Sequence, residues 1–222
     1  MIDIDDLKIP GTDVFKNKLG ITDRGKLASA EADFTAIRLT QLNRKPLVGA
    51  FTTEHLQGIH NYVFQDVYEW AGRLRDRDLP ERLAQLSAPP HEIEKALNRV
   101  LDRLSSENHL KGCEPVAWIE RSGYYLTELS QIQPFPTGNE LVVEEFTREL
   151  AQENNIWLRW DRITKDHITG ELNSSMQRSR GANLRRLIML ALDPEPVKHH
   201  HTRDLLRNMD HLRGREFGFT KY

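Results

Sequence analysis

The sequence contains a single cysteine, Cys113, among its 222 residues. One thiol excludes an internal disulfide and is typical of a protein in a reducing compartment. Long apolar runs are also lacking, and none approaches the 18 or more residues that a membrane-spanning helix needs. The first six residues are acidic and no apolar stretch follows them, so we expect no Sec-type signal peptide. We expect a cytoplasmic protein, or one that a dedicated secretion system delivers into a host or target cell.

An excess of either charge is also missing. The chain has 31 Lys and Arg against 33 Asp and Glu, a formal net charge of −2. Such a balance gives no global field that would attract nucleic acid or an anionic membrane. The sequence holds no internal repeat and no low-complexity segment. A chain of this length can bury a sizeable core as one domain with a tail.

Helical periodicity dominates what is present. Apolar residues recur at spacings of three and four through most of the chain, the pattern of amphipathic helices. Thr53 is predicted as the N-cap of the second helix, and Pro89-Pro90 opens the third. We expect helices over residues 25–43, 53–71, 90–104, 115–132, 139–154, 168–173 and 184–192.

Residues 72–87 do not follow the helical pattern at their start. Residues 73–80 alternate weakly like a short strand, whereas residues 79–86 suit a helix or a loop. Pro194 and Pro196 then mark a break, and the tail behind them has room for one short helix around residues 204–212. We therefore expect a mainly α domain over residues 1–193, including an N-terminal segment 1–22, and a tail over 194–222.

The stretch from Gln133 to Glu144 reads Gln-Pro-Phe-Pro-Thr-Gly-Asn-Glu-Leu-Val-Val-Glu. A helix that stops at Pro134, a turn at Gly138-Asn139 and a following helix place free backbone amides at a helix N-terminus. Such an end attracts anions, because its amides lack partners and the helix dipole is positive there. Most Gly-Asn turns before helices are only turns, so the turn by itself does not identify a site.

This stretch resembles the signature loop of Fic-family AMP transferases, His-Pro-Phe-x-(Asp/Glu)-Gly-Asn-Gly-Arg-x-x-Arg. We call residues 133–144 the signature loop. The segment GTDVFKNKLGITD at residues 11–23 resembles the N-terminal segment of Fic proteins, and four further blocks follow in family order. These blocks are residues 51–60, 64–72, 107–112 and 124–132. The resemblance covers residues 11–192 and implies the helical Fic (Fido) fold, with at most a short, altered β-hairpin flap.

The resemblance also implies the roles of two loop positions. In active members, which use ATP and Mg²⁺, a histidine at the position of Gln133 deprotonates the target hydroxyl that receives AMP. An acidic residue at the position of Thr137 holds the Mg²⁺. A glutamine amide neither takes nor releases a proton near neutral pH, so general-base catalysis, worth about 10² to 10⁴-fold, is lost. Thr137 is neutral and a poor ligand for a hard cation. We expect no catalytic residue and no bound metal.

The remaining loop positions concern the phosphates of ATP. The resemblance implies that the turn Gly138-Asn139-Glu140 cradles phosphates and that arginines at the positions of Leu141 and Glu144 hold them. Glu140 crowds a turn where the family keeps glycine, and Leu141 removes a bidentate clamp. Glu144 repels the triphosphate by about 4 kcal/mol per charge pair at about 4 Å and an effective dielectric of about 20. Glu145 adds a third acidic group to this helix start, and we expect no bound ATP.

The flap that the resemblance implies at residues 73–87 aligns the target segment in active members. Here it lacks the Lys-Gly tip that the family often has, and Pro80 cannot donate a strand hydrogen bond. His55 and His60 lie five apart on one helix and share no face, so we assign them core or boundary positions.

The prediction is therefore a Fic-fold pseudoenzyme that binds another protein through the former active-site cleft or the flap. Family habit places such a protein among bacterial effectors or toxin-related proteins. Two alternatives stay open. One is an enzyme that transfers AMP or another phosphate-containing group with different residues, and the other is a regulatory partner of an active Fic protein.

Overall fold

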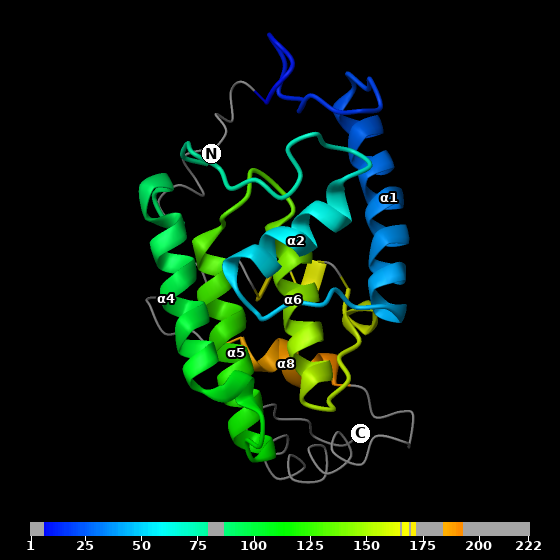
Figure 1. Cartoon of the computed structure of the whole chain (residues 1–222). Coiled ribbons are helices and arrows are strands. Elements are labelled where there is room, and N and C mark those ends of the chain that lie inside the picture. The colour runs from blue at the N-terminus through cyan, green and yellow to red at the C-terminus, as the bar shows by residue number, and fades with distance from the viewer. Residues whose placement is uncertain (1–6, 80–86, 165, 169, 172–183, 193–222) are drawn as a thin grey trace. The chain divides into compact units, whose positions relative to one another are not determined.

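A computed structural model describes residues 7–79, 87–164, 166–168, 170–171 and 184–192 of the chain (Figure 1). The chain divides into two compact units, one of residues 1–106 with 128–146 and one of residues 107–127 with 147–222. The whole signature loop belongs to the first unit. The tail helix expected around residues 204–212 and the flap residues 80–86 lie outside the described residues, so these expectations and the boundary at residue 194 stay predictions.

The described residues are mainly helical and form no sheet, which confirms a mainly α fold. Two isolated bridges, Lys8 with Phe15 and Leu158 with Leu192, are the β pairings that this part of the chain shows. The first unit contains α1 (Arg24–Arg44), α2 (Thr53–Phe64), η1 (Pro90–Glu92) and α4 (Ile93–Ser106). The second contains η2 (Asn108–Leu110), η3 (Trp160–Arg162) and α8 (Arg185–Ala191), while α5 (Pro115–Ile132) and α6 (Asn139–Glu153) belong partly to each.

The start of α2 differs by one residue from the prediction. Thr52, not Thr53, is the N-cap, and its hydroxyl accepts the backbone N–H of His55. The chain turns through a left-handed Phe51 (φ 53°), and Thr52 then adopts the extended backbone that an N-cap needs. The Thr53 hydroxyl instead donates to Asn98 Oδ1 at 2.8 Å, which ties α2 to α4.

The end of α2 was also predicted too late. The helix stops at Phe64 rather than just before Gly72, and residues 65–71 form tight turns. The rings of Tyr68 and Trp70 stack with centroids 4.4 Å apart in these turns, while the backbone N–H of Lys18 donates to Val67 O. Tertiary contacts with the N-terminal segment therefore override a helical sequence pattern.

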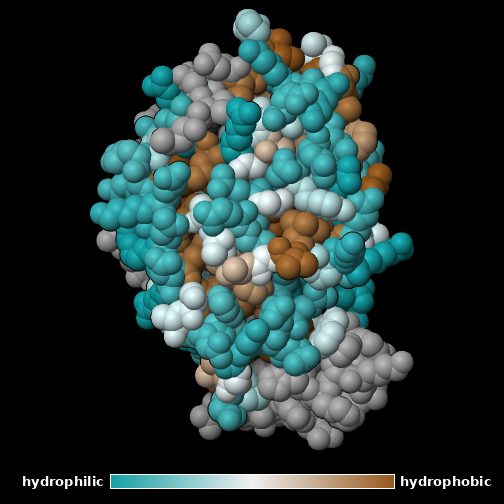
Figure 2. All heavy atoms as spheres, viewed as in Figure 1, coloured by the Kyte–Doolittle hydropathy of each residue, from teal (hydrophilic) through white to brown (hydrophobic). Residues whose placement is uncertain are grey.

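The apolar faces of the other helices were predicted with mixed success. In α4, four apolar residues at spacings of three and four are all buried, as the helical pattern predicts, namely Ile93, Leu97, Val100 and Leu104. On α1, however, Ile37 is 56% exposed, because only a narrow stripe of Leu27, Thr35 and Leu42 is buried. Polar residues cover most of the face seen in Figure 2, with apolar residues in small patches. No helix within the described ranges is both long and apolar enough to cross a membrane.

Candidate functional site: the signature loop

The signature loop begins where α5 ends. Gln133 adopts a left-handed backbone (φ 49°), and Pro134 follows, so the helix cannot continue. The side-chain amide of Gln133 turns back and donates to Ser130 O at 2.8 Å. The residue at the position of the family's catalytic base is therefore bound to the last turn of its own helix.

Asn139 closes the loop upon itself. Its Oδ1 accepts the backbone N–H of Phe135 at 2.9 Å, and its Nδ2 donates to Phe135 O at 2.9 Å. The side chain is 6% exposed, so these bonds form inside the protein. That the turn containing Asn139 can cradle phosphates stays a prediction; the side chain of Asn139 fixes the loop from within the chain.

His60 of α2 holds the loop from the other side. The backbone N–H of Gly72 donates to Nδ1 at 2.8 Å, so the proton of a neutral ring is on Nε2, which donates to Thr137 O at 3.2 Å. The ring also stacks on Phe135, with centroids 4.0 Å apart. Burial lowers the pKa of His60 to about 3, so the ring stays neutral in the folded protein near pH 7.

Arg75 ties the loop to the two ends of the flap segment. Its guanidinium is completely buried and donates to three carbonyl oxygens: Gln133 O at 2.7 Å, Arg77 O at 2.8 Å and Ala88 O at 2.6 Å. Its own backbone N–H donates to Pro134 O at 3.0 Å. Burial lowers the pKa of this guanidinium, while Asp78 acts in the opposite direction.

Gly138 lets the loop press directly on α2. Its φ is +76°, and a Cβ added here would lie 2.2 Å from Cζ of Phe64. Both the backbone conformation and the contact therefore require glycine. Together with the hydrogen bond from His60, this contact fixes the distance between the loop and α2.

Three of the five substituted positions lie on the accessible side of the first turns of α6. Glu140, Leu141 and Glu144 are partly exposed, whereas Val142, Val143 and Phe146 are buried. Glu140 and Glu144 stand one turn apart, where the helix dipole favours negative charge. Glu145, grouped with them from the sequence, is only 3% exposed and is therefore not part of this accessible acidic group.

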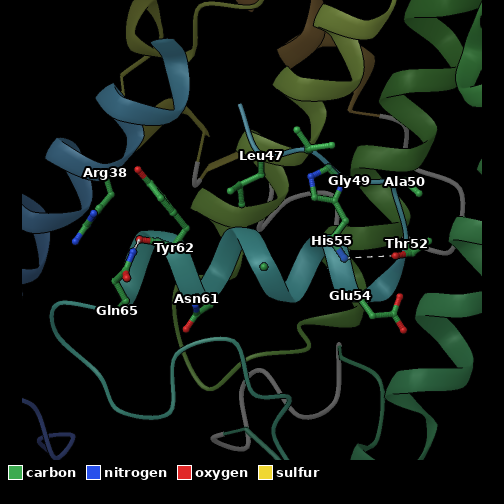
Figure 3. Close-up of a pocket in the computed structure, with 12 residues that line it drawn as sticks. Arg38, Leu47, Gly49, Ala50, Thr52, Glu54, His55, Asn61, Tyr62 and Gln65 are labelled. Carbon is green, nitrogen blue, oxygen red and sulfur yellow. Dashed lines mark hydrogen bonds between the residues drawn. The ribbon is translucent and has the colours of Figure 1, made fainter. Parts of the chain in front are cut away.

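A hollow of about 560 Å³ lies along α2, and no residue of the signature loop lines it (Figure 3). Several polar groups that line it already have partners within the chain. Tyr62 donates to Gln41, Gln65 donates to Tyr62 O, and Arg38 forms a bidentate ion pair with Asp66. These bonds join α1 to α2 and the turn behind it.

His55 and His60, which were predicted in core or boundary positions, are both buried. His55 Nδ1 accepts the backbone N–H of Phe51 at 3.2 Å, so this ring fixes the turn before α2. Among the described residues, no three His, Cys, Asp or Glu side chains gather in a way that could hold a metal ion.

The model of the Fic/DOC family matches residues 50–150 of this chain. The probable protein adenylyltransferase Fic of Escherichia coli is 32% identical over 157 residues, which cover 71% of this chain and 77% of that protein. The chain belongs to the Fic/DOC family. The protein adenylyltransferase VbhT of Bartonella schoenbuchensis is 36% identical over 160 residues, 72% of this chain. The match spans only 33% of VbhT's length.

Solved Fic domains confirm the fold. The N-terminal Fic domain of the Bep8 protein from Bartonella sp. 1-1C has a TM-score of 0.77 at 24% identity, over 85% of this chain and 95% of that one. The N-terminal Fic domain of a putative cell filamentation protein from Bartonella quintana, with bound ADP, has a TM-score of 0.79 at 23% identity. That match covers 91% of this chain and 98% of the other.

Sequence reasoning missed the two residues that hold this Fic loop most firmly. His60 was placed in the core without a role, and Arg75 was counted in a weak strand. At His60 the available signal was a polar residue within an otherwise buried pattern, whereas Arg75 lies among charged residues that gave no such signal. The partners could not be foreseen, because Thr137 lies 77 positions from His60 and Gln133 lies 58 positions from Arg75.

The neutral His60 predicts a specific pH dependence of stability. Its pKa is about 3 when folded and about 6.5 when unfolded, so only the unfolded state gains the proton between these values. The contribution of His60 is complete above about pH 6.5 and is lost as the pH falls, by up to about 1.4 kcal/mol per pH unit. Urea unfolding of the wild type and His60→Phe between pH 7 and pH 4 measures this slope.

His60→Phe keeps the stacking surface on Phe135 but has no group to titrate. We expect it to be less stable than the wild type at pH 7 and to show the flatter slope. Equal slopes in the two proteins, or a His60 ring that titrates near pH 6.5 in the NMR spectrum of the folded wild type, would contradict this assignment.

Proposed function

We propose that this Fic-family chain does not transfer AMP and that it acts by binding another protein. The observation that carries the proposal is the pair Glu140 and Glu144 on the accessible side of α6. Glu144 stands where active relatives hold phosphate with an arginine. A carboxylate there changes a favourable contact into a repulsion of about 4 kcal/mol at about 4 Å and an effective dielectric of about 20.

The base position supports the same conclusion. The amide of Gln133 donates to Ser130 O, and an amide cannot accept the proton of a target hydroxyl in any rotamer. Thr137 has no carboxylate for Mg²⁺, and its carbonyl oxygen already accepts a hydrogen bond from His60. The side chains of the loop therefore do not fit Mg-ATP in the way that active relatives hold it, and we derive no step through it.

The loop does not need a nucleotide to keep its shape. Asn139, His60 and Arg75 satisfy its backbone from within the chain. The result is a rigid turn that presents Glu140, Leu141 and Glu144 as an acidic edge with one apolar residue. A preorganised surface of this kind suits a partner protein with a basic segment, because little order has to be gained on binding.

Names of relatives support a setting for this role but do not establish it. VbhT and the Escherichia coli protein are named adenylyltransferases, and the Bep8 structure is described as a VirB-translocated Bartonella effector. We further propose that this chain works as an effector or toxin-related protein, either in the cytoplasm or in a cell into which it is delivered.

Calorimetry with Mg-ATP tests the loss of nucleotide binding. We expect an affinity weaker than millimolar for the wild type and for Gln133→His, because restoring the base leaves both glutamates in place. Gln133→His should also transfer no labelled AMP to proteins in a lysate. Micromolar binding by the wild type, or robust transfer by Gln133→His, would favour an active enzyme and overturn the proposal.

Site-specific photo-crosslinking tests the binding role. A photoreactive phenylalanine analogue at Leu141 lies on the acidic edge, whereas the same analogue at the exposed Glu94 of α4 serves as the matched control. In the cells that express the protein, we expect a discrete protein adduct from position 141 that Glu144→Arg removes. Adducts that are equal from both positions, or that persist in Glu144→Arg, would count against this surface.

A further inference from the structure

Three segments of the first unit meet at the buried side chain of Arg75. One acceptor, Gln133 O, lies at the start of the signature loop, whereas Arg77 O and Ala88 O lie at the two ends of the flap segment. All three acceptors are backbone carbonyl oxygens, so the bonds do not depend on which side chains those residues carry. We call Arg75 with these three bonds the arginine clamp.

Two backbone hydrogen bonds follow the same course as the clamp. The N–H of Arg75 donates to Pro134 O at 3.0 Å, and the N–H of Ala88 donates to Ile132 O at 3.4 Å. Ile132 is the last residue of α5, and Pro134 belongs to the signature loop. Both ends of the flap segment are therefore attached to the place where α5 passes into the loop.

The chemistry of a guanidinium makes the clamp cooperative. Its nitrogen atoms form a rigid planar fork, so one bond cannot be released without tilting the other two. Asp78 favours the charged form electrostatically, but the hydrogen bonds themselves go to neutral carbonyl oxygens. A buried cation that leaves these oxygens without reaching water loses free energy on both sides of each bond. We therefore expect the clamp to be either fully closed or fully open.

The path from the clamp to the acidic edge of the signature loop is short. The N–H of Arg75 holds Pro134 O, and Phe135 follows directly in the chain. Both the N–H and the O of Phe135 bind the side chain of Asn139, which is the first residue of α6. The acidic edge is the accessible side of the turns that begin there. An open clamp therefore removes the fixed neighbour of the residue that starts this helix.

His60 makes a second connection between the same parts. Its Nδ1 accepts the N–H of Gly72, three residues before Arg75, and its Nε2 donates to Thr137 O. The segment that leads into the flap is thus joined to the beginning and to the middle of the signature loop. Because the two connections act in parallel, full opening has to break both, and weakening either one makes opening more frequent.

We propose that the arginine clamp makes the signature loop and the two ends of the flap segment open and close as one unit, so that the acidic edge keeps its arrangement only while the clamp is closed. This coupling belongs to the framework and holds whatever the edge binds. Its use in regulation rests on the proposed function: a partner held by the edge also holds the flap ends closed, because coupling between two sites is reciprocal.

Native-state hydrogen exchange, followed at single amides of the full chain by NMR, tests the coupling without any partner. One reporter is the N–H of Phe135, which binds Asn139. The other is the N–H of Gly72, which binds His60. In the wild type we expect the same protection factor at both reporters. In Arg75→Met we expect it to fall about tenfold or more at both, as for the loss of a hydrogen bond to a charged group.

Two further variants make this result specific. Asn139→Ala weakens the loop at its other end, so reciprocity requires the N–H of Arg75 to lose protection as well. This variant also tests the coupling from the opposite side if Arg75→Met does not fold. Leu104→Ala, at a buried position of α4, lowers the stability of the whole fold but leaves the clamp intact. Protection at Phe135 and Gly72 should therefore stay unchanged in Leu104→Ala.

Three outcomes would overturn the proposal. The first is an Arg75→Met variant in which protection is lost at residue 75 but unchanged at both reporters. The second is an equal loss at the reporters in Leu104→Ala, since the loop would then open only when the whole protein unfolds. The third is an Asn139→Ala variant in which the N–H of Arg75 keeps its protection. None of these results bears on the binding role of the edge, which the crosslinking experiment tests separately.

Discussion

The buried ring of His60 is the contact on which the signature loop depends. It accepts a hydrogen bond from Gly72, donates one to Thr137 and stacks on Phe135, so one side chain links α2, the turn behind it and the loop. Arg75 extends the link to Ala88, at the far end of the flap. Both side chains bind backbone atoms of the loop, and His60 also stacks on the ring of Phe135. The five substituted positions can therefore change without disturbing the loop.

This separation explains how a member of the Fic/DOC family can keep its loop while the chemical groups differ. The conformation depends on Gly138, Asn139, Phe135 and their partners, all of which are present. At the altered positions Thr137 and Gln133, His60 and Arg75 bind only the carbonyl oxygens, which every side chain leaves in place. Glu140 and Glu144 even suit the positive end of α6, so their replacement of glycine and arginine does not have to destabilise the helix.

Much of the helical content could be predicted, because apolar spacing records which face of a helix is buried. The four buried residues of α4 and the start of α5 at Pro115 follow directly from it. The N-cap of α2 was placed one residue late, because two adjacent threonines fit the pattern and only the turn at Phe51 decides between them. Local sequence could not show that residues 65–71 leave the helix, since contacts with the N-terminal segment determine this.

The candidate site, like the fold, could be predicted from the sequence only in part. The family resemblance located the loop and its altered positions, and the structure adds that the side chain of Asn139 binds the backbone of Phe135. The roles of His60 and Arg75 depend on contacts between residues far apart in the chain. A sequence pattern indicates that such residues are buried, and only the structure shows what they hold.

The central claim is that the loop framework is intact and that only side chains exclude the nucleotide. The most direct test is calorimetry with Mg-ATP on one variant that restores all five family residues. The changes are Gln133→His, Thr137→Glu, Glu140→Gly, Leu141→Arg and Glu144→Arg. Our account predicts that this variant binds Mg-ATP with micromolar affinity. A variant that retains the helical circular-dichroism spectrum and cooperative unfolding of the wild type, yet binds no nucleotide, would contradict it.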